Sequence, residues 1–176
     1  MSAEGASTYG FDLVIAHPLG DDETDALFES GCEDVAPEIS ASSTTLHFDR
    51  EAVSLGAAIV SAVLDVEAAG LIVAGVGSPD LVDLPELSAR TGRTRESIRL
   101  LALGRRGPGG FPPAEGGFYS WSAVRAWFAQ YDPSSVGTPD AAALHHDRVI
   151  AAADHLVHAR SLIRGDDEGL AALVAA

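Results

Sequence analysis

The chain has 176 residues, which suits one or two small domains, and 47% of them are hydrophobic, which excludes a globally disordered protein. Its single cysteine, Cys32, excludes an internal disulfide framework and a zinc site built on cysteines, and suits a reducing compartment. The formal net charge of −15 would repel phosphate if it were spread evenly along the chain.

Residues 1–78 predict an acidic α+β module. Its expected elements, in chain order, are a strand over 9–15, a helix over 20–31 capped by Asp21 or Asp22, strands over 35–41 and 44–49 with Ser42 and Ser43 as their turn, a helix from its cap Ser54 to Gly70, and a strand over 71–76. This order of strand, helix, strand, strand, helix, strand is typical of a ferredoxin-like sandwich. That fold serves many functions, so it decides none.

Charge is distributed unevenly along the chain. Residues 1–86 hold 17 acidic residues and one arginine, whereas residues 87–110 hold six arginines and one acidic residue. Charges farther apart than about 8 Å are largely screened at physiological salt. The short basic segment can therefore attract phosphate although the chain as a whole is acidic.

The basic segment has the spacing of a helix-turn-helix. Residues 84–90 predict a first helix, Gly92 a turn, and residues 95–103 a second helix capped by Thr94. Gly92 lies five residues after the apolar Leu87 and six before the apolar Ile98. Such a motif places its second helix in the major groove of DNA. The residues predicted to contact DNA are Arg93, Thr94, Arg95, Glu96, Arg99, Arg105 and Arg106.

The segment after the second helix carries further motifs: Phe111-Pro112-Pro113, Tyr119-Ser120-Trp121, and a helix with Val124 and Trp127. With them, residues 82–129 resemble the winged helix-turn-helix of the MerR, excisionase and AlpA-like group, which has a wing, an aromatic-Trp strand and a closing helix. The whole chain resembles small actinobacterial proteins that join an acidic α+β module to this domain. The resemblance implies a DNA-binding domain over residues 79–131. Two positions depart from the group's pattern, since Arg93 replaces an apolar residue and the wing over 114–117 has no basic residue.

Residues 132–176 predict a linker over 132–139 and an amphipathic helix over 141–164. Its apolar residues recur at the spacing of a coiled-coil seam: Val149, Ala152, Leu156, Ala159 and Ile163. This seam would pack on its own chain or pair with a second chain, and the resemblance implies an antiparallel homodimer. The tail beyond Gly165 is expected to be loose. Helical spacing places His155 and His158 near one another, with Asp154 adjacent, but a solvated helix face is the favoured interpretation, so no metal site is predicted.

Together these features predict a sequence-specific DNA-binding protein, a transcriptional regulator of double-stranded DNA whose acidic module senses a ligand or holds a protein partner. The alternative is a non-enzymatic protein-interaction module, antitoxin-like or a defence accessory, whose arginine face binds an acidic protein surface. No spacing assigns a catalytic triad, a carboxylate pair or a phosphate loop, so neither an enzyme nor a cofactor is predicted. Without a signal-peptide pattern or an apolar run of about twenty residues, we expect a cytoplasmic protein that spans no membrane.

Overall fold

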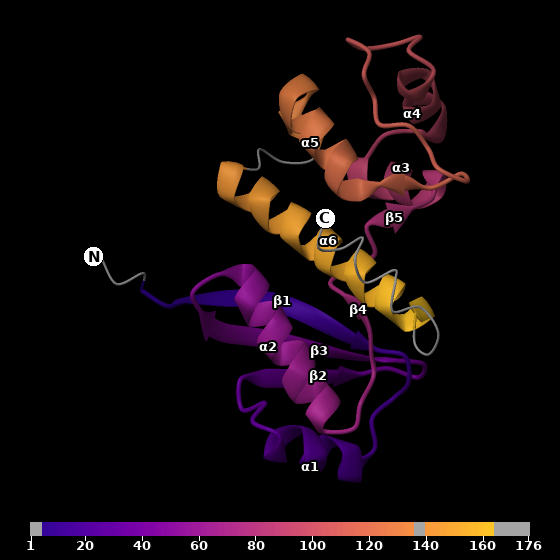
Figure 1. Ribbon diagram of the computed structural model, residues 1–176. Coiled ribbons are helices and arrows are strands. Elements are labelled where there is room, and N and C mark those ends of the chain that lie inside the picture. The colour runs from indigo at the N-terminus through magenta and orange to yellow at the C-terminus, as the bar shows by residue number, and fades with distance from the viewer. Residues whose placement is uncertain (1–4, 136–139, 164–176) are drawn as a thin grey trace. The chain divides into compact units, whose positions relative to one another are not determined.

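The computed structural model describes residues 5–135 and 140–163, and the chain divides into two compact units (Figure 1). One unit comprises the residues up to Ser78 together with those from Ala152 onward, and the other runs from Pro79 to Ala151. The helix α6 (Ala141–Ile163) is therefore shared between the two units, whereas the sequence predicts residues 132–176 as a segment of their own. The tail beyond Gly165 lies outside the described residues. No helix within the described ranges is long and apolar enough to cross a lipid bilayer.

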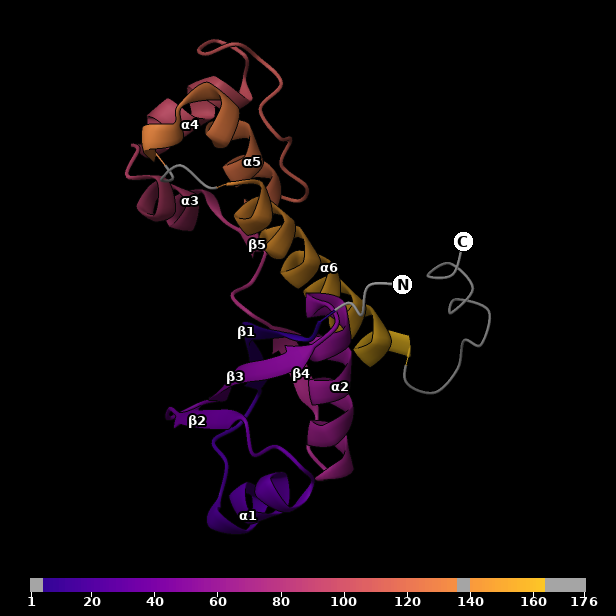
Figure 2. The same ribbon diagram turned by 90° about the vertical axis from the view of Figure 1, so that its left-hand side faces the viewer.

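The first unit contains a four-stranded antiparallel sheet with the strand order β2-β3-β1-β4. Its elements in chain order are β1 (Ser7–Ile15), α1 (Asp21–Glu29), β2 (Val35–Ile39), β3 (Thr44–Ala52), α2 (Leu55–Ala68) and β4 (Val73–Val76). The predicted order of strands and helices is confirmed, and the chain is α+β. Figures 1 and 2 both show α2 alongside the sheet, and α2 contacts three of its strands.

The alternation of side chains along the strands decides which face of the sheet is buried. Phe11 and Leu13 of β1 and Leu46 and Phe48 of β3 share one face and are buried. The rings of Phe11 and Phe48 stack with their centroids 5.4 Å apart. Because successive side chains of a strand point to opposite faces, the intervening residues, such as His47, form a polar second face.

Local hydrogen bonds set element boundaries that differ from the predicted ones. The N-cap of α1 is Gly20, not either predicted aspartate, and its N–H donates to the carboxylate of Glu23 at 3.0 Å. Strand β2 ends at Ile39 rather than at residue 41, because the N–H of Ser40 donates to the carbonyl of Ser43 at 2.8 Å and closes the turn. Backbone groups used in a turn are not available to a ladder, so the strand stops there.

The one arginine among the first 86 residues, Arg50, is buried in the first unit. Its guanidinium donates to both carboxylate oxygens of Asp34, at 2.7 and 2.8 Å, and to Asp65 at 2.6 Å. It also lies 5.1 Å from the ring centroid of Phe48. The bonds with Asp34 raise the pKa of Arg50 and lower the pKa of Asp34. A paired cation of this kind ties β3 to α2 and leaves the unit's exposed charge predominantly acidic.

The second unit surrounds its own core with three helices and a two-stranded sheet. Its elements are β5 (Leu81–Val82), α3 (Leu84–Thr91), α4 (Arg95–Ala102), β6 (Tyr119–Ser120), α5 (Trp121–Tyr131), a 3-10 turn (Pro133–Ser135) and the start of α6. Its buried core residues are Val82, Leu87, Ile98, Leu101, Phe111, Tyr119, Val124 and Phe128. The two helices of the predicted helix-turn-helix are confirmed to within one residue at their C-termini.

Two features of the second unit differ from the sequence-based expectation. Strand β5 pairs antiparallel with β6 and was not predicted, because two residues are too short to show a period. Trp121 begins α5 instead of ending the aromatic strand. The reason is a cap. The hydroxyl of Ser120 accepts a hydrogen bond from the N–H of Ala123 at 3.2 Å, which makes Ser120 the N-cap and Trp121 the first residue of the helix.

Candidate nucleic-acid interface

The turn between α3 and α4 is built from local signals that the sequence carries. Gly92 adopts φ 65° and ends α3 in the left-handed conformation, which glycine reaches without steric cost. The hydroxyl of Thr94 then caps α4 by accepting a hydrogen bond from the backbone N–H of Ser97 at 3.1 Å. Leu87 of α3 and Ile98 of α4 are fully buried on either side of this turn. The opposite face of α4 is therefore left to solvent.

The exposed face of α4 carries both signs of charge. Arg95, Glu96 and Arg99 are all exposed, with 65% of the Arg99 side chain and 66% of the Glu96 side chain accessible. The guanidinium Nη1 of Arg99 lies 3.6 Å from a carboxylate oxygen of Glu96. Because a pair this open is weakly coupled in water, each side chain is available to a partner. Leu103, just after the helix, is 53% exposed beside them.

Arg93 does not join that exposed face. Its guanidinium pairs with the carboxylate of Asp132 and lies 5.1 Å from the ring centroid of Phe128, leaving 22% of the side chain accessible. Arg90 is held in a comparable way, 2.8 Å from Glu86 and over a ring of α5. A cation stacked on a buried aromatic ring fills the place that an apolar residue usually takes after the turn glycine. Arg93, which was predicted to contact DNA, therefore attaches the turn to α5 through these contacts.

Arg105 and Arg106 lie on the glycine-rich loop that follows α4, and both are exposed. This loop is anchored on the core. Trp127 donates its indole N–H to the carbonyl of Gly109 at 3.0 Å. Gly107 has φ 77°, and a Cβ at this position would lie 2.9 Å from a leucine side chain of α4. The two arginines are consequently held next to the C-terminal end of α4 by contacts that leave their guanidinium groups in solvent.

The wing is a tight hairpin without basic residues. Glu115 and Phe118 form an antiparallel bridge, and Gly116 and Gly117 between them have φ 60° and 93°. Two successive residues with positive φ form the two-residue turn that suits the twist of a hairpin. The side chain of Phe118 is 49% exposed at this turn. The wing therefore offers an aromatic ring and a carboxylate instead of cations.

The predicted seam of α6 is not the face that packs within the first unit. There the buried side chains are Asp154 and Val157. Within the seam, Ala152 and Leu156 are exposed, and Val149, Ala159 and Ile163 are half-buried. The seam's pairing with a second chain remains a prediction.

Asp154 closes the edge of the sheet with its buried carboxylate, which also lies 3.4 Å from Nδ1 of His158. Its buried carboxylate accepts a hydrogen bond from the N–H of Val76 in the edge strand β4 at 2.9 Å. Nδ1 of His158 lies 2.9 Å from the carbonyl oxygen of Asp154, within the same helix. Covering an edge N–H is one means by which proteins keep an edge strand from pairing with another chain. Cys32 is also structural: it is fully buried, and burial raises the pKa of its thiol.

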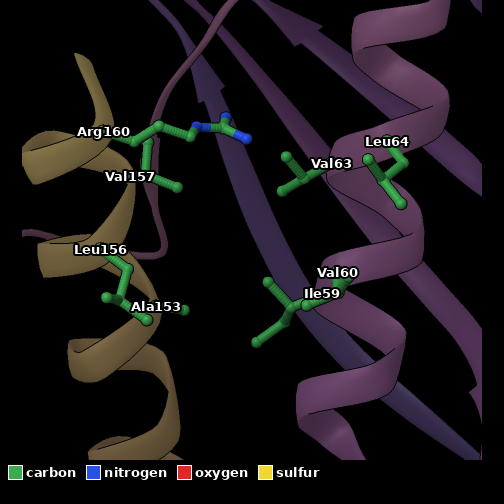
Figure 3. Close-up of a pocket in the computed structure, with 8 residues that line it drawn as sticks. All are labelled: Ile59, Val60, Val63, Leu64, Ala153, Leu156, Val157 and Arg160. Carbon is green, nitrogen blue, oxygen red and sulfur yellow. The ribbon is translucent and has the colours of Figure 1, made fainter. Parts of the chain in front are cut away.

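The first unit also has an apolar groove of about 180 Å³ between α2 and α6 (Figure 3). It is lined by Ile59, Val60, Val63, Leu64, Ala153, Leu156, Val157 and Arg160. Val60 and Leu64 are each 59% exposed, and Leu156 is 47% exposed. The lining cation, Arg160, is paired with Glu67 at 2.6 Å.

The polar face of the sheet holds a histidine that sequence reasoning did not single out. Nδ1 of His47 on β3 lies 2.8 Å from a carboxylate oxygen of Asp12 on β1, and Nε2 lies 3.0 Å from one of Glu38 on β2. The hydrogen bonds with Glu38, then Asp12, raise the pKa of His47. Alternation along each strand places the three residues on one face, but only the strand order shows that they meet.

Comparisons of the chain with protein-family models, with curated proteins and with solved structures found no significant match.

Proposed function

We propose that this protein is a sequence-specific DNA-binding protein that reads the major groove with α4. The observation that carries the proposal is the exposed pair Arg95 and Arg99 on a capped helix after a left-handed glycine turn. Arg105 and Arg106 follow on an anchored loop. Four exposed arginines on one short segment of a chain with a net charge of −15 indicate a local anionic partner.

The proposal extends to the two folds. We assign residues 79–131 to a winged helix-turn-helix of the MerR, excisionase and AlpA-like group, on the support of the α3–turn–α4 spacing, the glycine hairpin and the closing helix α5. We assign the first unit to the ferredoxin-like sandwiches, supported by the antiparallel order β2-β3-β1-β4 with a helix in each of the β1–β2 and β3–β4 connections.

In this mechanism the first turn of α4 enters the major groove. Its free backbone N–H groups and Arg95 hold a phosphate, Arg99 contacts a base edge, and Arg105 and Arg106 hold the backbone beyond the helix. Two copies paired through the seam of α6 would read two half-sites, as a cytoplasmic transcriptional regulator does. None of these contacts requires a catalytic group.

A second candidate is supported by the wing. Phe118 is 49% exposed, and the residues before it include a carboxylate and no cation, which suits a protein surface better than a phosphate backbone. In that function the arginine face would bind an acidic protein. Protein partners of this kind would compete with DNA, so the two candidates predict different results when duplex DNA is offered alone.

The test is selection of bound sequences from a random duplex pool, followed by affinity measurements at two salt concentrations. We expect a shared sequence in the selected pool, and an affinity that falls steeply as salt rises. Arg99→Ala should weaken binding to that sequence by about 1–3 kcal/mol if it removes a bidentate base contact. The control Arg148→Ala removes an exposed arginine of α6 and should have little effect. A pool without enrichment, or equal losses in both variants, would contradict the proposal.

A further inference from the structure

Glu96 is an unusual residue for a face that binds DNA. Its side chain is 66% exposed between the exposed Arg95 and Arg99 on α4. A carboxylate there repels phosphates, so it lowers affinity for every duplex. The fold does not depend on it for capping, because the hydroxyl of Thr94 supplies the cap of α4. A residue that costs affinity without capping the helix can still act by discriminating among bases.

The chemistry of the two side chains selects particular bases. A carboxylate can only accept hydrogen bonds, and in the major groove cytosine offers the N4 amino donor that Glu characteristically contacts. At a guanine or a thymine the same carboxylate would face acceptor oxygens and be repelled. The guanidinium of Arg99 has only donors, and its fork matches the O6 and N7 acceptors of guanine.

The spacing of these two groups suits neighbouring base pairs. Glu96 and Arg99 are three residues apart on one helix face, and their head groups lie 3.6 Å from each other. Three residues advance about 4.5 Å along a helix, which is close to the rise of about 3.4 Å between successive base pairs. On the basis of the proposed function, we propose that Glu96 and Arg99 together restrict the binding site to one with adjacent cytosine and guanine contacts under the first turns of α4.

The test measures base preference and affinity separately. The site selected by the wild-type chain is synthesised with each of the four base pairs at every position, and each duplex is titrated with the wild type and with Glu96→Gln. We expect a preference of about tenfold or more for cytosine at one position and for guanine at a neighbouring position. In Glu96→Gln, affinity for duplexes with other bases at that position should rise, and the cytosine preference should change to adenine, which a glutamine amide contacts through N6 and N7.

Glu86→Gln is the matched control. It makes the same change of charge at a side chain that is 50% exposed on α3 and pairs with Arg90, away from the exposed face of α4. We expect it to leave the base preference unchanged. If Glu96→Gln alters only the overall affinity, as Glu86→Gln does, the carboxylate acts through charge alone and this inference is overturned, while DNA binding by α4 stands. If the wild-type chain selects no sequence at all, the proposed function and the inference both fail.

Discussion

Replacing Arg93 or Arg99 by alanine makes the same chemical change six residues apart, yet the structure predicts opposite consequences. Arg93 pairs with the partly buried Asp132 and lies over Phe128. Hydrogen bonds between charged groups contribute about 1.5–3 kcal/mol, reduced here because 22% and 30% of the two side chains are accessible. A cation over a ring adds about 0.5–1 kcal/mol. Arg93→Ala should therefore lower the free energy of unfolding of the second unit by roughly 2 kcal/mol.

Arg99→Ala should leave stability almost unchanged. The side chain is 65% exposed, and its pair with Glu96 at 3.6 Å is worth at most about 0.5 kcal/mol. Its loss should appear in DNA binding instead, as a decrease of about 5- to 150-fold for the selected duplex. The Arg93 variant, measured well below its melting temperature, should bind that duplex almost as the wild type does.

Both tryptophans of the chain, Trp121 and Trp127, lie in the second unit, so their fluorescence reports the unfolding of that unit. A loss of about 2 kcal/mol should lower its melting temperature by roughly 10 °C. Binding is measured by the anisotropy of a labelled duplex at 15 to 20 °C. Equal melting temperatures for Arg93→Ala and the wild type would refute the structural role of the first arginine. An unchanged affinity in Arg99→Ala would refute the role of the second.

Three further predictions concern the loop, the α6 seam and the sheet. Gly107→Ala should destabilise the second unit more than Gly109→Ala in a thermal melt, because both have positive φ but only the first Cβ would clash, at 2.9 Å. Leu156 is 47% exposed in one chain, so Leu156→Asp should act on the contact between chains and convert a dimer to a monomer in sedimentation, and an unaltered dimer would exclude the seam. The raised pKa of His47, caused first by Glu38, means that its stabilisation is complete below pH 6.5 and is lost as the pH rises through the raised value. In urea unfolding, the difference in the free energy of unfolding between the wild type and His47→Asn should then decrease from pH 6 to pH 9, by less than about 1 kcal/mol. A difference that stays constant over this range would contradict the prediction.

The sequence by itself determined the elements whose signals are local. The caps Ser54 and Thr94 and the turn glycine Gly92 act on backbone groups within a few residues, so their effect does not depend on the rest of the fold. Strand alternation is equally local, and it predicted the strands over 9–15 and 44–49, whose buried face includes Phe11 and Leu46. The order of elements in the first unit and the two helices on either side of Gly92 could therefore be predicted without knowing what packs against what, whereas the two-residue strand β5 could not.

Only the tertiary structure decided how each charged side chain is used. Arg93 and Arg99 were both predicted to contact DNA, but Arg93 pairs with Asp132, 39 residues further along the chain, whereas Arg99 is exposed. In α6 the apolar spacing predicted a buried seam that contains Leu156. In the structure, Asp154 is buried instead and accepts a hydrogen bond from the edge N–H of β4, so a different face of the helix packs against the sheet. The physical reason is the same in both cases. A buried polar group must find its partner wherever the fold brings one, and periodicity along a single segment carries no information about that partner.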